Sequence, residues 1–177
     1  MMSQPLAERL RPKTLDDYIG QKHLVGQGAV LRKMIDAGRV PSFILWGPPG
    51  VGKTTLAQII ANKLDAPFYT LSAISSGVKD VREVIEKAKS NRFFNTVSPI
   101  LFIDEIHRFS KSQQDSLLNA VETGVVTLIG ATTENPSFEV IRPLLSRCQV
   151  YVLKSLDKND LLRLLHRAIA EDVVLGD

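Results

Sequence analysis

Residues 43–54 read FILWGPPGVGKT, a short apolar run that leads into a loop rich in Gly and Pro. An amphipathic stretch of helical spacing follows the loop directly. The loop matches the pattern G-x-x-x-x-G-K-[ST], which between a strand and a helix is typical of a site that holds nucleotide phosphates. The sequence therefore predicts nucleotide binding by Gly47, Pro48, Pro49, Gly50, Val51, Gly52, Lys53, Thr54 and Thr55.

The residue types in this loop suit the chemistry of phosphate binding. Glycines at 47, 50 and 52 let the backbone curl until its N–H groups point at phosphate oxygens. The N-terminus of the following helix adds its positive dipole. We expect Lys53 to reach the β- and γ-phosphates and the Thr54 hydroxyl to coordinate Mg²⁺. The alternative is a Gly/Pro-rich turn that binds nothing.

Short apolar runs alternate with amphipathic stretches along the chain. The helical stretches cover 54–64 and 79–90, and a further helix begins at Ser110, where S-x-x-Q forms a capping box, and stops at Gly124. Nearly continuous apolar strands are typical of parallel sheets that are buried on both faces. The pattern predicts an α/β fold, a three-layer P-loop NTPase domain with a parallel five-stranded sheet. The expected strands are 43–46, 68–71, 100–103, 125–129 and 150–153.

The end of the sequence has a different pattern. Asp157 is placed to cap a helix with apolar residues at helical spacing, and no further strand follows. We expect this helix to be the first of a second, helical element; the family resemblance given below implies an ATPase core over residues 1–154 and the start of a truncated helical lid over residues 155–177. The apolar positions of this helix are Leu161, Leu162, Leu165, Ala168 and Ile169.

Two acids follow the third expected strand. Asp104 and Glu105 come directly after Ile100–Ile103. The carboxyl ends of strands are where open α/β sheets bind their ligands. We expect Asp104 to hold Mg²⁺, mostly through water, and Glu105 to orient and polarise the attacking water. The alternative is a solvated acidic turn.

Composition excludes several classes of protein. The 177 residues are 44% hydrophobic and 23% charged, which argues against disorder and a disulfide scaffold. No apolar run is long enough for a transmembrane helix, and the polar N-terminus does not resemble a secretory signal. The single cysteine, Cys148, fits a reducing compartment, so we expect a cytoplasmic protein without a membrane partner. The net charge of +3 permits a nucleic-acid partner without requiring one.

The motifs together resemble those of AAA+ ATPases. GPPGVGKT, ILFIDEIHR, GATTENPSF and LLSRC occur in the order typical of that superfamily, and LAERLRPKTLDDYIGQ resembles the nucleotide-pocket segment of clamp loaders and branch-migration motors. SGVKDVRE, DEIHRFSKSQQD and GATTENPSF together resemble the replication-associated recombination protein A family, which includes the Werner-helicase-interacting protein of eukaryotes. The resemblance extends over nearly the whole chain.

The resemblance implies a DNA-dependent ATPase that acts in replication-associated recombination and in the rescue of stalled replication forks. It implies ATP and Mg²⁺ as cofactors, DNA ends, gaps or junctions as partners, and a homo-oligomer in the full-length form. The alternatives are a clamp-loader subunit, a Holliday-junction branch-migration motor, and a nucleotide-gated scaffold that holds a partner such as single-strand-binding protein. The second sensor arginine of these ATPases has no candidate in this sequence.

The resemblance also assigns roles to single residues. Thr133 takes the position of the first sensor, with Asn135 beside it, and Arg147 takes that of the arginine finger, which acts on the nucleotide of a neighbouring subunit. Ser72 takes the place of a polar switch residue. The ordinary alternatives are strand-end caps for Thr133 and Ser72 and a surface salt bridge for Arg147. The adenine pocket is expected from Arg11, Pro12, Tyr18 and Ile19, for which the alternative is plain domain packing.

Basic residues near two helix starts are candidates for DNA contacts. Lys79 and Arg82 lie in one helix and Lys111 begins another. Helix starts suit phosphates, although exposed lysines are commonly just solvated. A basic–aromatic group at 92–94 (Arg92, Phe93 and Phe94) offers base stacking or, alternatively, burial. His107 is a candidate for coupling the nucleotide site to DNA or to a neighbouring subunit, and the alternative is a packing role. The sequence contains no His/Cys cluster of the kind that binds zinc.

Overall fold

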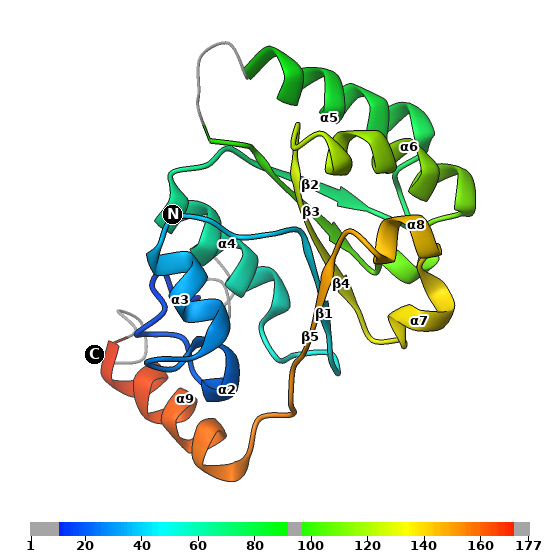
Figure 1. Cartoon of the computed structure of the whole chain (residues 1–177). Coiled ribbons are helices and arrows are strands. Elements are labelled where there is room, and N and C mark those ends of the chain that lie inside the picture. Colours follow the sequence, from blue (N-terminus) through cyan, green and yellow to red (C-terminus); the bar gives the residue numbers. More distant parts are fainter. Residues whose placement is uncertain (1–10, 92–96, 172–177) are drawn as a thin grey trace, which may run out of the picture.

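A five-stranded parallel sheet forms the centre of the computed structural model, which describes residues 11–91 and 97–171 (Figure 1). The strand order is β2-β3-β4-β1-β5, and every neighbouring pair is parallel. The predicted α/β class and five-stranded parallel sheet are confirmed. The strands are β1 (Phe43–Trp46), β2 (Phe68–Ser72), β3 (Ile100–Asp104), β4 (Thr127–Thr132) and β5 (Gln149–Val152).

Helices cover both faces of the sheet and make it the middle of three layers. Alternate residues of β1 point to opposite faces, so Phe43 and Leu45 join one apolar cluster and Ile44 joins the other, all of them fully buried. One face is covered by α2 (Lys22–Val25), α3 (Val30–Asp36) and α4 (Lys53–Leu64). The other face is covered by α5 (Val78–Asn91), the 3-10 turn η1 (Ile106–Arg108), α6 (Lys111–Glu122), α7 (Pro136–Glu139) and α8 (Arg142–Leu145).

The predicted limits of α6 are confirmed by its caps. The Ser110 hydroxyl accepts a hydrogen bond from the Gln113 backbone N–H at 3.2 Å, and the Gln113 side-chain oxygen accepts one from the Ser110 N–H at 2.7 Å. These reciprocal bonds satisfy donors that a helix start otherwise leaves unpaired. Gly124 follows the helix with a φ of 72°, a left-handed conformation that favours glycine.

The expected start of the fourth strand was wrong by two residues. Val125 and Val126 are buried, but their backbone N–H groups donate to the Ala120 carbonyl at 2.9 and 3.3 Å and so close the end of α6. The strand begins at Thr127 and extends to Thr132. The apolar run therefore contains a helix end as well as the start of a strand.

The final helix, α9 (Lys158–Glu171), lies beyond β5 at one end of the domain (Figure 1). Asp157 caps it as predicted, because its carboxylate accepts a hydrogen bond from the Asp160 N–H at 2.7 Å. The Asp160 carboxylate in turn accepts one from the Asp157 N–H at 3.2 Å. Most apolar side chains of the helix remain exposed to water by 41–63%: Leu161, Leu162, Leu165 and Ile169.

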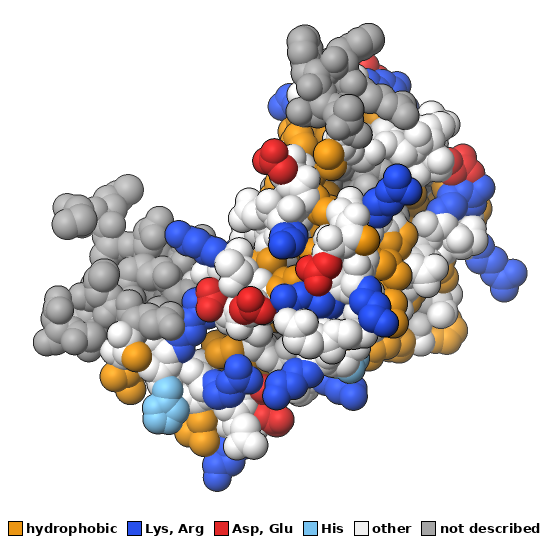
Figure 2. Space-filling model, turned by 60° about the vertical axis from the view of Figure 1, so that its left-hand side comes forward, with side chains coloured by type: hydrophobic (Ala, Val, Ile, Leu, Met, Phe, Trp, Pro, Cys, Tyr) orange, Lys and Arg blue, Asp and Glu red, His pale blue; other side chains and the backbone are white. Residues whose placement is uncertain are grey.

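Basic side chains of the described residues do not form a single patch on the face of the molecule shown in Figure 2. Lys and Arg side chains are spread among hydrophobic and neutral surface on the face shown in Figure 2. Within residues 11–91 and 97–171, no helix is both long and apolar enough to span a bilayer.

Candidate nucleotide-binding site

The loop after β1 is held tightly against the strand ends beside it. The Gly47 N–H donates to the Thr132 carbonyl of β4 at 3.1 Å. A Cβ atom on Gly47 would lie 2.8 Å from the Leu153 Cβ and 2.9 Å from the Leu153 carbonyl oxygen, so this position admits only glycine. Gly50 and Gly52 have φ values of 78° and 90°, which also favour glycine. The loop thus has the curled backbone that phosphate binding needs.

Lys53 opens α4 and turns its side chain back into the loop. Its ammonium donates to the Gly47 carbonyl at 2.7 Å and to the Pro48 carbonyl at 2.9 Å. Burial lowers the pKa of Lys53, and the negative charge of Asp104 opposes this by raising it. Asp104 is therefore within electrostatic reach of the lysine. Thr54 and Thr55 follow in the first turn of α4, both half-buried.

The acidic pair lies at the same edge of the sheet as the loop. Asp104 ends β3 and is paired in register with Ser72, the last residue of β2. Glu105 has a φ of 52° and a ψ of 49°, an uncommon conformation for a residue with a side chain. Its carboxylate forms an ion pair with the Arg108 guanidinium at 3.2 Å. Strained residues of this kind cluster at functional sites.

The end of β4 lies between the loop and the acidic pair, because the strand order places β4 between β1 and β3. Two adjacent threonines there differ in their exposure to solvent. Thr133, the predicted sensor, is exposed, whereas the Thr132 side chain is buried and lies 2.9 Å from the His107 ring nitrogen Nδ1. Asn135, the expected neighbour of the sensor, caps α7 by accepting from the Ser137 N–H at 3.0 Å.

A cavity of about 380 Å³ opens beside the loop. It brings together the four residues predicted for the adenine pocket and four residues at the loop and the first turn of α4, and it adds three residues of the C-terminal segment. Its lining consists of Arg11, Pro12, Tyr18, Ile19, Gly50, Val51, Gly52, Thr55, Leu156, Leu164 and Arg167.

Comparison with known proteins identifies the family of this domain. The AAA family, described as the ATPase family associated with various cellular activities, matches residues 43–156. The chain belongs to the AAA family. It is therefore an ATPase domain, and the loop described above lies within the matched residues.

The similarity to named relatives extends beyond the matched segment. The chain is 53% identical to replication-associated recombination protein A of Haemophilus influenzae, over 94% of this chain and 37% of that protein. It is 51% identical to the ATPase WRNIP1 of Dictyostelium discoideum, over 98% of this chain and 20% of that protein. The resemblance predicted from the motifs is confirmed. The chain spans at most about two-fifths of the length of these relatives.

A solved structure shows the same architecture. The Holliday junction branch migration motor RuvB of Thermotoga maritima superposes with a TM-score of 0.73 and 31% sequence identity. The match covers 92% of this chain and 54% of that one. The AAA domain therefore shares its fold with a branch-migration motor as well as with the recombination proteins.

Tyr18 joins the N-terminal segment of the AAA domain to the loop. Its hydroxyl lies 2.9 Å from the Val51 carbonyl and 3.1 Å from the Gly52 carbonyl, within reach to donate to either. Burial raises the pKa of Tyr18, which keeps the hydroxyl protonated as a donor. A Cβ atom on Gly52 would lie 2.9 Å from this hydroxyl. The segment around Tyr18 thus fixes the backbone of the loop as well as forming a wall of the cavity.

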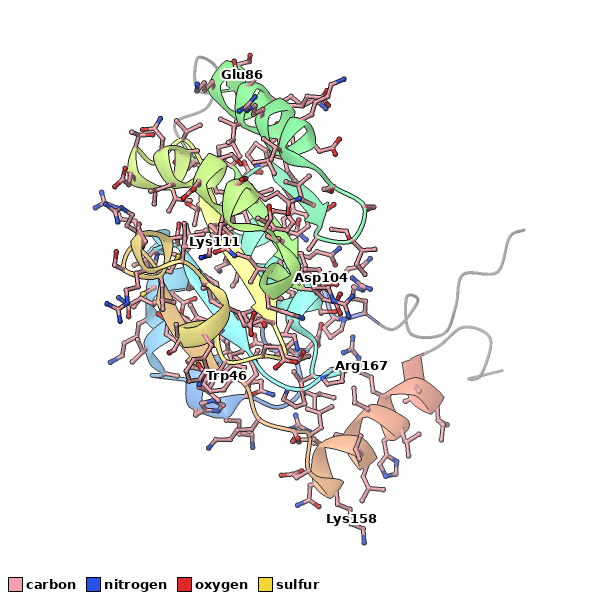
Figure 3. All side chains as sticks on the ribbon, turned by 90° about the vertical axis from the view of Figure 1, so that its right-hand side faces the viewer. Trp46, Glu86, Asp104, Lys111, Lys158 and Arg167 are labelled. Carbon is pink, nitrogen blue, oxygen red and sulfur yellow. The ribbon has the colours of Figure 1, made fainter. Side chains whose placement is uncertain are left out.

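Sequence reasoning missed the contribution of α9 to the cavity. Arg167 donates to the Asp17 carbonyl at 2.9 Å, and in Figure 3 it extends from α9 toward the body of the domain, whereas Lys158 extends away. The direction of α9 is set by Gln21, whose buried amide donates to the Lys154 carbonyl at 2.6 Å and accepts from the Lys154 N–H at 2.8 Å. Gln21 has a φ of 56°, and the sequence gives no clear sign of this left-handed backbone conformation.

Arg147 lies at the opposite edge of the sheet. It precedes Gln149, which pairs with Phe43 at the start of β1, whereas the loop follows Trp46 at the end of β1. The length of β1 puts about 10 Å between these edges. The Arg147 guanidinium pairs with the Glu122 carboxylate and donates to the Pro143 carbonyl at 2.5 Å. It is therefore placed away from the loop of its own chain.

The remaining predicted residues have simpler surroundings. Burial raises the pKa of the Cys148 thiol to about 11, which makes it a poor nucleophile. Ser72 is exposed, and its hydroxyl accepts from the Ile74 N–H at 3.4 Å. Among the residues that the structure describes, no three His, Cys, Asp or Glu side chains gather as metal ligands. The basic–aromatic group at 92–94 falls outside the described residues.

Proposed function

We propose that this AAA domain binds MgATP and hydrolyses it to drive remodelling of DNA ends or gaps in replication-associated recombination. The observation that carries the ATPase part is the placement of Lys53 and Asp104 at one edge of the sheet, close enough for the acid to oppose the pKa shift of the lysine. The name of the relatives that share 52–53% identity supports the recombination context.

The residues at this edge fit ATP and Mg²⁺. Thr54 and Asp104 offer a hydroxyl and a carboxylate, which are the oxygen ligands that Mg²⁺ prefers, and we assign the ion to them. When bound, Mg²⁺ neutralises charge on the phosphates. Lys53 exchanges its bonds to the Gly47 and Pro48 carbonyls for phosphate oxygens. Glu105 orients the attacking water, and Thr133 contacts the γ-phosphate or that water.

Catalysis in this proposal also needs a neighbouring subunit. Arg147 lies at the edge away from its own loop, so we assign it to the γ-phosphate held by the next subunit of a homo-oligomer. A planar guanidinium suits the charge that develops on the transferred phosphoryl group. In this arrangement Arg147 leaves Glu122, its partner in the single chain. Residues 155–177 are proposed as the start of a lid that closes the adenine side of the cavity.

The proposed DNA contacts lie at two adjacent helix starts. The Gln113 side chain at the start of α6 donates to the Ser76 carbonyl just before α5 at 2.6 Å, which brings the two starts together. Lys79, Arg82 and Lys111 are exposed there. Basic side chains and helix N-termini both suit phosphate groups. We therefore propose that DNA binds to this surface. We also propose that the protein is cytoplasmic and that single-strand-binding protein is a partner on the same DNA.

A second candidate function is branch migration at a Holliday junction. The observation in its favour is the superposition with the RuvB motor at 31% identity. The two functions differ in the DNA that should stimulate hydrolysis: a four-way junction for branch migration, and a gapped or single-stranded end for the proposed function.

The test is MgATP hydrolysis by the full-length protein with gapped duplex, four-way junction and no DNA. We expect gapped duplex to stimulate hydrolysis most, and the stimulation to fall as salt rises because phosphate contacts release counterions. The double variant Lys79→Ala, Arg82→Ala should lose stimulation. Lys87→Ala, which removes an exposed lysine toward the other end of α5, should keep it. Tight ATP binding with negligible turnover on any DNA would instead indicate a nucleotide-gated scaffold, and stimulation by the four-way junction alone would indicate a branch-migration motor.

A further inference from the structure

Thr132 is the meeting point of the three segments that surround the proposed phosphate site. Its backbone carbonyl accepts a hydrogen bond from the N–H of Gly47. Gly47 is the first residue of the loop between β1 and α4, here called the phosphate loop. Its hydroxyl accepts from the Glu134 N–H at 2.9 Å, in the turn that carries Thr133. The same hydroxyl lies 2.9 Å from Nδ1 of His107, in the turn that follows the acidic pair. One buried residue therefore contacts the loop, the sensor turn and the acidic turn.

The Thr132 hydroxyl has hydrogen-bond partners for its donor and acceptor groups in either tautomer of His107. Besides the Glu134 N–H and His107, it lies 3.2 Å from the Glu134 carbonyl. If His107 carries its proton on Nδ1, the hydroxyl accepts from the ring and donates to that carbonyl. If Nδ1 is unprotonated, the hydroxyl donates to the ring instead. A hydroxyl accepts up to two bonds and donates one, so both tautomers satisfy it.

The turn that follows Glu105 contacts β4 through the Thr132–His107 hydrogen bond and through one apolar contact. Ile106, fully buried, packs where Gly130 leaves room, since a Cβ atom at Gly130 would lie 3.1 Å from the Ile106 Cδ1. His107 adds the polar contact to Thr132 at the next position. Glu105 precedes both residues and has the strained φ of 52° that begins the turn. The orientation of its backbone therefore depends on how the turn sits on β4.

We infer that the Thr132–His107 hydrogen bond positions Glu105 against the phosphate loop, which makes Thr132 and His107 positioning residues for ATP hydrolysis. The inference rests on the proposed role of Glu105. The bond acts on the direction of the carboxylate and leaves the phosphate loop intact, because Gly47 is held by the backbone of Thr132 and not by its hydroxyl. Loss of the hydroxyl should consequently slow hydrolysis more than it weakens nucleotide binding.

The test compares Thr132→Val, which removes the hydroxyl but keeps the shape, with Thr132→Ser, which keeps the hydroxyl. In the full-length protein, Thr132→Val should lower kcat for MgATP about tenfold with little change in KM, as expected when a reacting group is displaced. Thr132→Ser should restore most of kcat. Thr127→Val, the same change at the other end of β4, serves as the control for a general effect on the strand.

A double-mutant cycle with His107→Ala separates positioning from packing. If both residues act through one bond, Thr132→Val combined with His107→Ala should be no slower than the worse single variant. Additive losses, or a Thr132→Val protein with wild-type kcat, would overturn the inference. If Thr132→Val fails to fold, Thr132→Ser and His107→Ala still decide it, since the first should hydrolyse well and the second slowly.

Glu105→Gln, measured beside these variants, separates the inference from the proposed function. A Glu105→Gln protein that hydrolyses ATP at the wild-type rate would refute the role of Glu105 and with it the proposed mechanism. An inactive Glu105→Gln protein together with a fully active Thr132→Val protein would refute only the positioning role of the Thr132–His107 bond.

Discussion

The carboxyl edge and the amino edge of the sheet hold their charged side chains in different ways. At the carboxyl edge, Lys53 is bonded to two carbonyls of its own loop and Glu105 is fixed by a strained turn. At the amino edge, Arg147 pairs with Glu122, and each of these side chains is more than one-third exposed. The proposed function therefore asks little rearrangement of Lys53, whereas it asks Arg147 to exchange its partner.

If Arg147 acts on the nucleotide of a neighbouring subunit, as proposed above, the difference between the edges explains why such an ATPase would be complete only as an oligomer. Strand direction places the phosphate loop and the arginine at opposite ends of β1, so a single chain cannot bring them together. A head-to-tail contact between copies would place the amino edge of one against the carboxyl edge of the next. The variants below disturb one edge at a time, beginning with the largest expected effect.

Replacing the arginine should cause the largest loss. We expect Arg147→Ala to lower kcat by about 10³-fold, because a guanidinium that stabilises the transferred phosphoryl group is worth about that much or more. ATP affinity should change little, since Arg147 is remote from the loop of its own chain. Steady-state hydrolysis and equilibrium binding of a fluorescent nucleotide measure the two quantities. Arg142→Ala, which removes an exposed arginine of the preceding helix α8, is the matched control, and equal losses in both variants would argue against a specific role.

Replacing the lysine should affect binding as well as hydrolysis. Lys53→Ala removes the side chain that spans the phosphate loop, and we expect kcat/KM for MgATP to fall by about 10²- to 10³-fold. Nucleotide affinity should fall too, in contrast to the arginine variant. Lys63→Ala, at the far end of α4, should bind and hydrolyse normally. A Lys53→Ala protein with wild-type affinity would show that the loop does not hold the phosphates.

Replacing Tyr18 should have a moderate effect on the carboxyl edge. Tyr18→Phe leaves the carbonyls of Val51 and Gly52 without their buried donor, which costs about 1–3 kcal/mol of stability. For a domain of this size, 1 kcal/mol lowers the melting temperature by about 2–4 °C. Thermal unfolding with and without ATP measures this. Tyr151→Phe removes only a 3.8 Å contact to the Met34 sulfur and should change stability much less; similar losses in both would mean that the two carbonyl bonds do not matter.

Removing the partner of the arginine should have the smallest effect. Glu122→Gln breaks a pair in which both side chains are more than one-third exposed, and such pairs are worth about 0–1 kcal/mol. We expect the melting temperature to change little and hydrolysis to remain near the wild-type rate. A large loss of hydrolysis would indicate that Glu122 holds Arg147 in its working position.

Local sequence patterns predicted the carboxyl edge well. The loop, the strand ends with Asp104 and Glu105 and the capping box at Ser110 all depend on residues within a few positions of one another. The start of β4 was not predictable in the same way, because Val125 and Val126 suit a strand by composition but donate their N–H groups to the end of α6.

Features that depend on distant segments were missed. The sequence does not reveal that Thr132, and not Thr133, is buried against His107, since that follows from how η1 sits on β4. It also does not reveal that Arg167 faces the cavity, since Gln21 and Lys154 set the direction of α9 across more than one hundred residues of sequence. The pairing of Arg147 with Glu122 is a third contact of this kind.

The most direct test of the two-edge arrangement is to mix two inactive variants of the full-length protein. Glu105→Gln keeps Arg147 but lacks the residue proposed to orient water, and Arg147→Ala keeps the whole carboxyl edge. In mixed oligomers, some contacts bring Arg147 of a Glu105→Gln subunit to the intact carboxyl edge of an Arg147→Ala subunit. Random assortment makes these about a quarter of all contacts. The mixture should therefore recover up to about a quarter of the wild-type ATPase rate. Mixed oligomers that hydrolyse no faster than the separate variants would contradict the assignment of Arg147 to the site of a neighbouring subunit.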